Sequence, residues 1–403
     1  MATAFATAVV AALVFRLALP SSFRASSVSD YDDFYAPVAR RIAAGLGPTL
    51  APGVPATQYP PGYPLLLAAS FACGRLVGVS ESAAALALGV VASGVVAVLL
   101  LRLAYRAWRP RAALVAPLAW TTYPLTLWLT KQPGSELPFV VFLLAGLALA
   151  WRAFDGRRVG VAAAAGIVLG GAMLVRPIAL GVPVVVAGSA VLISGARSAR
   201  AAALAAVVVC GAAVPVLPWE LWVWSRTGEV VLLSTGGLPS MRDGLLFGAG
   251  SKAYRDAVDL PPRAAAVMEE LRPGVTAARS VGDVGRAVAA AWRTRPVGTA
   301  ELVGAKAARS WYATDSARHE RLLLPLQLAY LALAAVGGAV AWRMGGASRA
   351  LALGVGALVV YFWAMTVVVL SIVRYMVPAM ALLFLLLPGL MAGRARRPTS
   401  ARA

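Results

Sequence analysis

The sequence is poor in charged residues, and acids are the scarcest. Only 13% of its 403 residues are charged and 17 are Asp or Glu, whereas 60% are hydrophobic. So few charges cannot cover the surface of a soluble domain of this size, which excludes an ordinary water-soluble globule. Apolar runs close to the length of about twenty residues that a spanning helix needs recur from Phe5 to Met391. The sequence therefore predicts an all-α polytopic membrane protein.

Cysteine and histidine are nearly absent. Cys73 and Cys210 lie in separate apolar runs, which gives neither a disulfide framework nor metal-ligand spacing. A single histidine, His319, excludes histidine-cluster metal sites. No Walker loop, dinucleotide fingerprint or Gly-x-Ser-x-Gly elbow occurs in the strand-to-helix context that each requires. Soluble nucleotide-driven chemistry is therefore unsupported.

The formal net charge is +20, but its distribution does not indicate nucleic-acid binding. The arginines gather in short clusters between apolar runs, a pattern typical of cytoplasmic loops in membrane proteins. These clusters are Arg102–Arg111, Arg152–Arg158, Arg197–Arg200, Arg343–Arg349 and the tail from Arg394. The chain must cross the membrane twice between consecutive clusters, and each pair of crossings turns around outside.

Counting crossings between these cytoplasmic clusters predicts about ten spans with both termini cytoplasmic. The first apolar run contains Arg16 and lacks a basic leader, so we interpret it as a span and not as a signal peptide. The run 63–79 has no crossing to make and is expected to lie along the outer surface. The predicted spans are 5–19, 83–101, 113–130, 138–154, 159–175, 177–194, 201–224, 323–342, 350–372 and 376–392.

Two outer segments are too long to be simple turns. The domain prediction is a membrane module over 1–224 that includes the first outer loop, 20–82. An outer subdomain follows over 225–322, then membrane helices and a basic tail over 323–403. Helix-compatible stretches at 262–272 and 283–294 indicate that the subdomain is partly ordered. Loops this long are usually functional or disordered.

Acids concentrate in the first outer loop, at Asp30, Asp32 and Asp33. Asp32 and Asp33 precede a helix-like run, so they could cap its N-terminus; however, capping needs one polar side chain, and neighbouring carboxylates repel each other. A reactive carboxylate is the better interpretation. Glu136 is the lone acid of the next outer turn and is either a functional residue or a solvated loop residue.

Basic residues at the outer ends of spans are exceptions to the general pattern, in which arginines gather in cytoplasmic loops. Arg176 and Arg374 lie at such ends, and Lys131 and Arg226 are expected on the same face. Each arginine could simply reach toward lipid headgroups. Together the four side chains predict a pocket for a phosphate group.

Several short strings of residues along the chain together resemble the membrane-embedded GT-C glycosyltransferases, in particular the protein-mannosyltransferase-like and aminoarabinose-transferase-like group. The matching strings are spread over nearly the whole chain. Their order along it and their expected placement on one membrane face make the resemblance specific. The strings are Tyr31-Asp32-Asp33-Phe34-Tyr35, Tyr59-Pro60-Pro61-Gly62-Tyr63-Pro64, Ser135-Glu136, Arg176-Pro177, Pro218-Trp219, Thr227-Gly228-Glu229, Ser234-Thr235-Gly236-Gly237 and Arg374-Tyr375.

The resemblance implies a GT-C-like fold and transfer of a sugar, with inversion, from a polyprenyl-phosphate donor to an acceptor hydroxyl on a lipid, glycan or protein. The site would lie on the extracytoplasmic face of the inner membrane. Asp32 is the expected general base, with Asp33 second, and Glu136 would orient the acceptor or hold a divalent metal. The donor phosphate is assigned to Lys131, Arg176, Arg374 and Tyr375. Acceptor or loop positioning is assigned to Asp30, Tyr35, Tyr59 and Arg226.

A transporter or flippase of a lipid-linked or small anionic substrate is the alternative from another class. Such proteins usually carry an ionisable or broken-helix site at the membrane midplane, within related halves. Here the charges lie at the outer rim, and one loop of roughly a hundred residues makes the halves unlike. The pattern favours the transferase.

Overall fold

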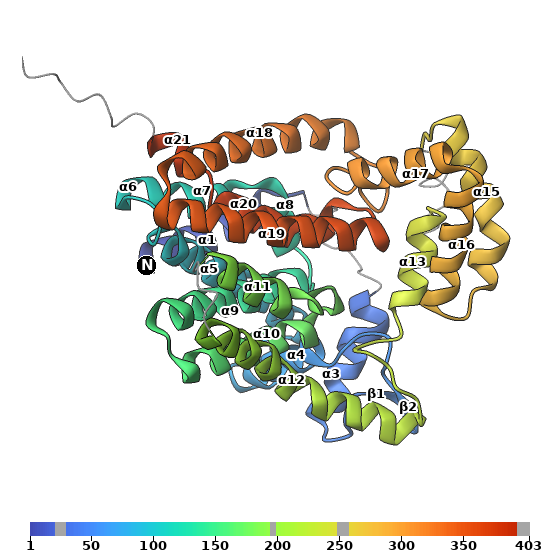
Figure 1. Ribbon diagram of the computed structural model, residues 1–403. Coiled ribbons are helices and arrows are strands. Elements are labelled where there is room, and N and C mark those ends of the chain that lie inside the picture. The colour runs from blue at the N-terminus through green and yellow to red at the C-terminus, as the bar shows by residue number, and fades with distance from the viewer. Residues whose placement is uncertain (21–29, 194–198, 248–257, 393–403) are drawn as a thin grey trace, which may run out of the picture.

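The computed structural model describes residues 1–20, 30–193, 199–247 and 258–392. Long helices lie side by side and form a bundle (Figure 1). In these described ranges, six segments are long and apolar enough to cross a membrane. They are α5 (Glu81–Ala104), α9 (Glu136–Gly156), α12 (Ala199–Thr227), α18 (Glu320–Met344), α19 (Gly346–Val368) and Val373–Ala392, which contains η3 (Val373–Met376), α20 (Val377–Phe384) and α21 (Gly389–Ala392). The predicted all-α polytopic class is confirmed.

A broken pair and three shorter helices occupy the other predicted spans. α6 (Pro110–Ala113) and α7 (Val115–Thr122) meet α8 (Pro124–Thr130) at a bend of 54°, where Pro124 interrupts the helical hydrogen bonding. The shorter apolar helices are α1 (Ala2–Ala18), α10 (Val159–Val175) and the stretch Pro177–Leu192, made of η2 (Pro177–Ala179) and α11 (Val182–Ile193). Their lengths lie at the lower limit for a crossing, so the count of ten stays a prediction.

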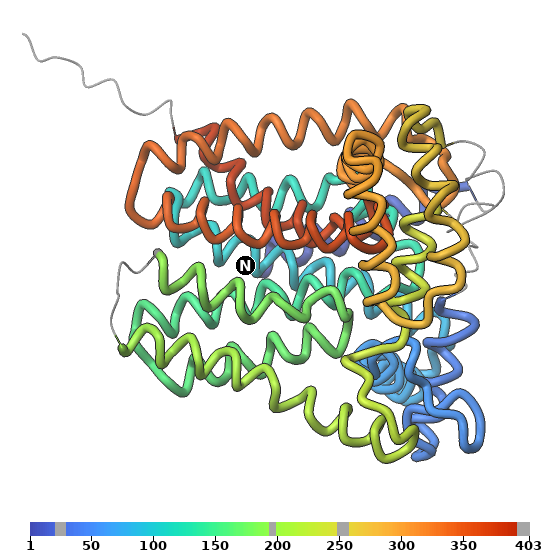
Figure 2. Tube along the Cα trace, turned by 45° about the vertical axis from the view of Figure 1, so that its right-hand side comes forward, coloured from blue at the N-terminus to red at the C-terminus, as the bar shows by residue number. Residues whose placement is uncertain are grey.

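The two ends of the bundle carry different kinds of connection. The short connections α9–α10 and α18–α19, which carry arginine clusters, lie at one end (Figure 2). Arg197 and the tail from Arg394 lie outside the described residues. The opposite end, called the loop end below, carries η1 (Asp30–Tyr35), α3 (Ala36–Ala43), the hairpin of β1 (Thr49–Ala51) and β2 (Val54–Pro55), and α4 (Gly62–Leu76).

α4 corresponds to the apolar run that was expected to make no crossing. Figure 2 views α4 nearly along its axis, whereas the long helices run across the picture. α4 packs on α3 and α5, and its first residue, Gly62, lies against the backbone of Leu174 at the end of α10. α4 thus closes the loop end instead of extending the bundle.

Glycines bring α10 and α12 into backbone contact. A Cβ placed on Gly166 would lie 2.4 Å from the carbonyl oxygen of Val208, and one on Gly170 would lie 2.2 Å from that of Ala212. Both glycines face α12 because they are four residues apart on one helix. Close approach through small residues is a common way to pack helices in a lipid solvent, where the hydrophobic effect between helices is weak.

This packing gives a first prediction. Gly170→Ala is expected to lower the free energy of unfolding by about 1–3 kcal/mol, because the added methyl group meets backbone that cannot move aside. Gly160→Ala on the same helix is the control, since a Cβ there has nothing within 4 Å. Thermal unfolding in detergent compares the two variants. Equal stability of both would show that the helices separate at little cost.

A second, smaller core lies at the loop end. It joins α13 (Gly237–Leu245), α15 (Pro262–Ala277), α16 (Val281–Thr294) and α17 (Pro296–Arg309), around buried residues such as Leu245, Val267 and Leu302. The helix-compatible stretches 262–272 and 283–294 lie within α15 and α16. This unit touches the bundle closely, because a Cβ on Gly244 would lie 1.6 Å from the carbonyl oxygen of Val369.

A buried lysine holds this unit to the bundle. Lys306 of α17 donates hydrogen bonds to the carbonyl oxygens of Gly244, at 2.6 Å, and Val369, at 3.0 Å. These carbonyls belong to the C-terminal ends of α13 and α19, where helix dipoles favour a cation, whereas burial lowers the pKa of Lys306 to about 7. The C-terminal ends of α13 and α19 are thereby held near each other, and the start of α13 and the end of α19 line the cavity described next.

Candidate active site

A cavity of about 190 Å³ opens at the loop end, between the bundle and the segments that cover it. Its polar lining comes from distant parts of the chain, including the first loop, the start of α9, the end of α10, the start of α13 and the segment that follows α19. The polar lining residues are Asp30, Tyr35, Tyr59, Gln132, Ser135, Glu136, Arg176, Ser234, Ser240, Arg374 and Tyr375. We call it the Glu136 cavity.

Local sequence explains how Glu136 and Arg176 enter the cavity. Pro177 disfavours the helical conformation for the residue before it, so α10 ends and Arg176 is extended, with φ −146° and ψ 125°. Glu136 is the first residue of α9, and a Cβ at Gly134 would lie 2.5 Å from its Oε2. A side chain at position 134 would therefore have to displace the carboxylate from its present position.

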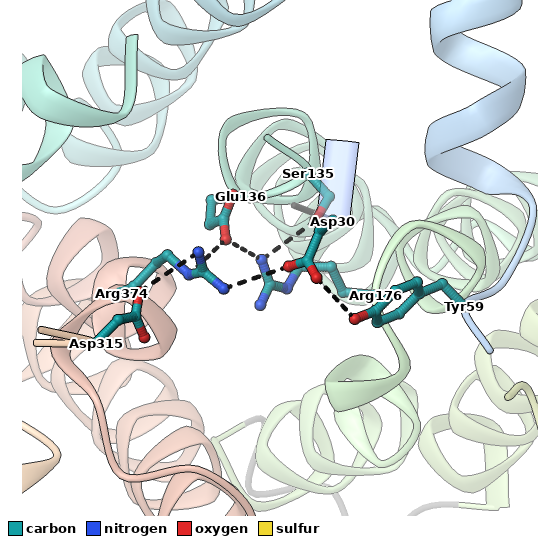
Figure 3. Close-up of polar contacts among 7 residues, drawn as sticks. All are labelled: Asp30, Tyr59, Ser135, Glu136, Arg176, Asp315 and Arg374. Atoms are coloured by element: carbon teal, nitrogen blue, oxygen red, sulfur yellow. Dashed lines mark hydrogen bonds and ion pairs between the residues drawn. The ribbon is translucent and has the colours of Figure 1, made fainter. Parts of the chain in front are cut away.

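Glu136 is the centre of an ion-pair cluster (Figure 3). Its Oε1 lies 2.6 Å from Nη1 of Arg176 and 3.2 Å from Nε of Arg374. The Glu136 side chain is only 8% exposed, so these pairs are largely shielded from solvent. Burial disfavours the charge of Arg176, but the Glu136 carboxylate, Tyr375 and Tyr35 together outweigh burial, so the pKa of Arg176 is raised. Nη1 of Arg176 also donates to Oγ of Ser135, at 3.2 Å.

Arg374 reaches three carboxylates. Besides Glu136, its Nη2 lies 3.7 Å from Asp30 and its Nη1 lies 3.7 Å from Asp315. Both distances are long for a hydrogen bond. The buried Nε lies 3.2 Å from Glu136 Oε1 without the geometry of a hydrogen bond. Nη1 and Nη2 of Arg374, with their long pairs, therefore keep hydrogen-bonding capacity that an anion in the cavity could use.

Asp30 faces Arg374 and is held from the other side by Tyr59, whose hydroxyl donates to Oδ1 at 3.1 Å. Burial, and then the negative charge of Asp30, raise the pKa of Tyr59, which keeps the phenol protonated as a donor. The rings of Tyr35 and Tyr59 lie 5.1 Å apart, and burial raises the pKa of Tyr35. These aromatic contacts fix the first loop to the wall of the cavity.

Two backbone hydrogen bonds bring later segments to the cavity. The amide of Val373 donates to the carbonyl of Ala313, at 2.8 Å, which places Asp315 beside Arg374. The amide of Thr235 donates to the carbonyl of Thr57, also at 2.8 Å, which places the start of α13 against the first loop. Asp315 has no counterpart among the residues predicted from the sequence. Its position as an acid in the short connection before α18 is the signal that could have indicated it.

The structure separates the other predicted residues from this group. Asp32 and Asp33 are exposed on the π-helical η1 and do not line the cavity, and α3 begins after Tyr35 without a side-chain cap. Lys131 lies outside the lining, with its Nζ 3.6 Å from the ring centre of Trp128, while its carbonyl accepts a hydrogen bond from Arg16 at 3.0 Å. Arg226 is exposed in the last turn of α12.

A metal site was one alternative for Glu136. Among the described residues, no three His, Cys, Asp or Glu side chains come close enough to hold a metal ion together. The carboxylates of Asp30 and Glu136 are held by arginines and by Tyr59. This donor set does not fit a divalent cation.

No protein family and no curated protein sequence matches the chain. A solved structure matches it over 98% of its length, with a TM-score of 0.56 at 13% identity: the oligosaccharyltransferase AglB from Archaeoglobus fulgidus, in complex with an inhibitory peptide and a dolichol-phosphate. ArnT from Cupriavidus metallidurans, bound to undecaprenyl phosphate, matches with a TM-score of 0.44 at 15% identity, over 99% of this chain and 81% of ArnT. The chain spans about half of AglB, 52% of its length. The match to AglB shows that this chain has the GT-C-like membrane fold expected from its loops.

Proposed function

We propose that the chain is a GT-C-type glycosyltransferase that moves a sugar from a polyprenyl-phosphate donor to an acceptor hydroxyl at the Glu136 cavity. The observation that carries this proposal is the convergence of Arg176 and Arg374, from distant segments, on one cavity that also holds the Asp30 carboxylate. Transfer of a sugar from its phosphate to a hydroxyl needs a cationic site for the leaving phosphate and a base for the acceptor.

The two arginines are suited to the donor phosphate. Each guanidinium has five N–H donors in a planar fork, and Glu136 uses only part of this capacity. The pairs from Arg374 to Asp30 and Asp315 are long, at 3.7 Å each, so a phosphate oxygen can replace them at small cost. The ring of Tyr375 lies 4.9 Å from the Arg176 guanidinium and supports it from the side.

Asp30 is suited to act as the general base. Its Oδ1 accepts from Tyr59 and its Oδ2 faces Arg374, so its position is set from two sides. The side chain is 37% exposed, which leaves it accessible to an acceptor. A carboxylate placed in this way can accept the proton of a hydroxyl that becomes more acidic as it attacks.

The reaction then balances without another reactant. The acceptor oxygen forms a bond to the anomeric carbon of the sugar while the bond from that carbon to the phosphate oxygen breaks. Asp30 takes the hydroxyl proton, and the leaving polyprenyl phosphate keeps the electron pair of the broken bond. Arg176 and Arg374 stabilise the negative charge that develops on the phosphate. Attack opposite the leaving group inverts the anomeric configuration.

Glu136 has a positioning role in this scheme. It is nearly buried and contacts both guanidiniums, so it is poorly placed to meet an acceptor hydroxyl directly. Its charge keeps the two arginines close together before the donor arrives, which prepares the site for a phosphate. The donor brings its own long apolar chain, which explains why the site lies at the end of a lipid-embedded bundle.

We place the cavity on the extracytoplasmic face of the inner membrane. The support is the separation of the short arginine-rich connections at one end of the bundle from the loop end (Figure 2), whose segments line the Glu136 cavity. Arginine-rich short loops are retained in the cytoplasm, so the opposite end faces outward. The acceptor would then be a hydroxyl of an envelope lipid, glycan or protein.

Donor binding is the direct test. Arg176→Gln and Arg374→Gln are each expected to weaken binding of undecaprenyl phosphate at least tenfold, because each removes a charge-assisted contact worth about 1.5–3 kcal/mol. Arg75→Gln, at an exposed arginine in the last turn of α4, is the matched control and should bind normally. Native mass spectrometry or isothermal titration measures the affinity in detergent.

Thermal unfolding of each variant, and the charge-retaining Arg374→Lys, separate lost binding from lost folding. Equal affinity in all folded variants would contradict the phosphate site. A sugar-loaded donor then tests the reaction: the transferase must release polyprenyl phosphate. Transport of intact donor across vesicles, without that release, would instead support a flippase.

A further inference from the structure

A second cavity, of about 380 Å³, lies at the arginine-rich end of the bundle and shares no lining residue with the Glu136 cavity. It is enclosed by the ends of α5, α9, α11, α12 and α19. Three arginines line it, Arg106, Arg157 and Arg200, with Asp155 as the acid among the lining residues. We call it the Arg157 cavity.

The charges of this cavity do not balance. Arg106 pairs with Asp155, which leaves Arg157 and Arg200 in excess among the lining residues. Nη2 of Arg200 donates to the backbone carbonyl of Arg157 at 3.0 Å, so the two residues are held together although their charges repel. Burial, and then the neighbouring Arg152, lower the pKa of Arg106. An anion in the cavity would relieve this excess of positive charge.

The backbone of Arg157 is a second, independent observation. It is the C-cap of α9 and has φ 50° and ψ 43°, in the left-handed region. Glycine is the common residue at such helix ends, because any side chain there costs conformational energy. The chain does have a glycine here, Gly156, but it lies one position earlier, inside the helix. An unfavourable conformation that is occupied by arginine in a cavity wall points to a function for the guanidinium.

The walls indicate what kind of anion fits. Apolar and aromatic side chains form much of the lining, including Leu103, Trp151, Phe154 and Leu351. The cavity lies where apolar spans end and arginines begin, which is the depth of lipid headgroups. Its volume falls in the range of small-molecule sites. A free inorganic anion would neutralise the arginines but would leave the apolar walls exposed to water.

We propose that the Arg157 cavity binds the headgroup of an anionic phospholipid, with the phosphate on Arg157 and Arg200 and the glycerol region against Trp151 and Phe154. Basic pockets between spanning helices recognise such headgroups through charge and shape together. The lipid would bridge α9, α12 and α19, which otherwise meet around an open space at this end. This inference concerns a site separate from the proposed reaction, so the two can fail independently.

Arg157→Gly is the informative variant, because it removes the guanidinium and also the unfavourable conformation. In nanodiscs of phosphatidylcholine it should unfold at the wild-type temperature or above. Its binding of phosphatidylglycerol should nevertheless be about tenfold weaker, from the loss of one charge-assisted contact. Arg200→Gln should show a similar loss. Arg343→Gln, at an exposed arginine of α18 outside the cavity, should bind like the wild type.

Native mass spectrometry counts bound phosphatidylglycerol, and thermal shift in nanodiscs with and without this lipid gives the stabilisation. A parallel arm adds inorganic phosphate to phosphatidylcholine nanodiscs. Saturable binding of the lipid that depends on Arg157 but not Arg343 supports the proposal. Equal loss in Arg343→Gln would overturn it in favour of general surface attraction. Equal stabilisation by phosphate alone, lost in Arg157→Gly, would overturn the lipid as the ligand.

Discussion

Asp30→Asn is expected to lower the rate of sugar transfer by about a hundred- to ten-thousand-fold, because an amide cannot accept the proton of the acceptor hydroxyl. The change keeps the size of the side chain and its acceptor oxygen for Tyr59, so the fold and the first loop should persist. Donor binding should change little, since the arginines remain. The measurement is release of polyprenyl phosphate from a sugar-loaded donor, with donor affinity determined on the same preparation.

Asp32→Asn and Asp33→Asn are the matched controls, because they make the same chemical change in the same turn at exposed positions outside the cavity. Both should keep most of the activity. If Asp32→Asn carried the large loss and Asp30→Asn did not, the base would be the aspartate that the sequence favoured, and the orientation of η1 would have to change when substrates bind.

Glu136→Gln is expected to have the largest effect on stability. Its carboxylate is the shared partner of two guanidiniums in a site that is largely shielded from solvent, and removing one member of a buried ion pair costs about 3–5 kcal/mol. The neutral amide leaves Arg176 and Arg374 close together without the negative charge that offsets their mutual repulsion. Unfolding by heat or denaturant in detergent measures the difference in stability from wild type.

Glu81→Gln is the control for this variant. Glu81 also pairs with an arginine, Arg40, at 2.7 Å, but the side chains are 32% and 56% exposed. Exposed pairs contribute about 0–1 kcal/mol, so this change should be nearly neutral. Adding undecaprenyl phosphate should restore part of the stability of Glu136→Gln, since a phosphate can replace the lost negative charge. A Glu136→Gln protein as stable as the wild type would show that the arginines do not depend on this carboxylate.

The sequence by itself determined the class of fold and most of the candidate residues. Long apolar runs can exist in lipid only as helices, and arginine clusters assign the connections to one end or the other. These two rules were enough to place Glu136, Arg176 and Arg374 on the same face, although they are far apart in the chain. Both rules act locally, through the solvent around each segment, and therefore can be read without tertiary contacts.

Only the tertiary structure decided which side chains of that face meet. Asp30, Asp32 and Asp33 are nearly equivalent in sequence, and the π-helical turn η1, packed through Tyr35 and Tyr59, directs Asp30 to the cavity. Lys131 shares a turn with Glu136 yet lies against Trp128. Asp315 joins Arg374 through a backbone hydrogen bond between residues 313 and 373. The direction of a side chain depends on backbone conformation and on distant packing partners, and neither is encoded in the local pattern of charge and hydropathy.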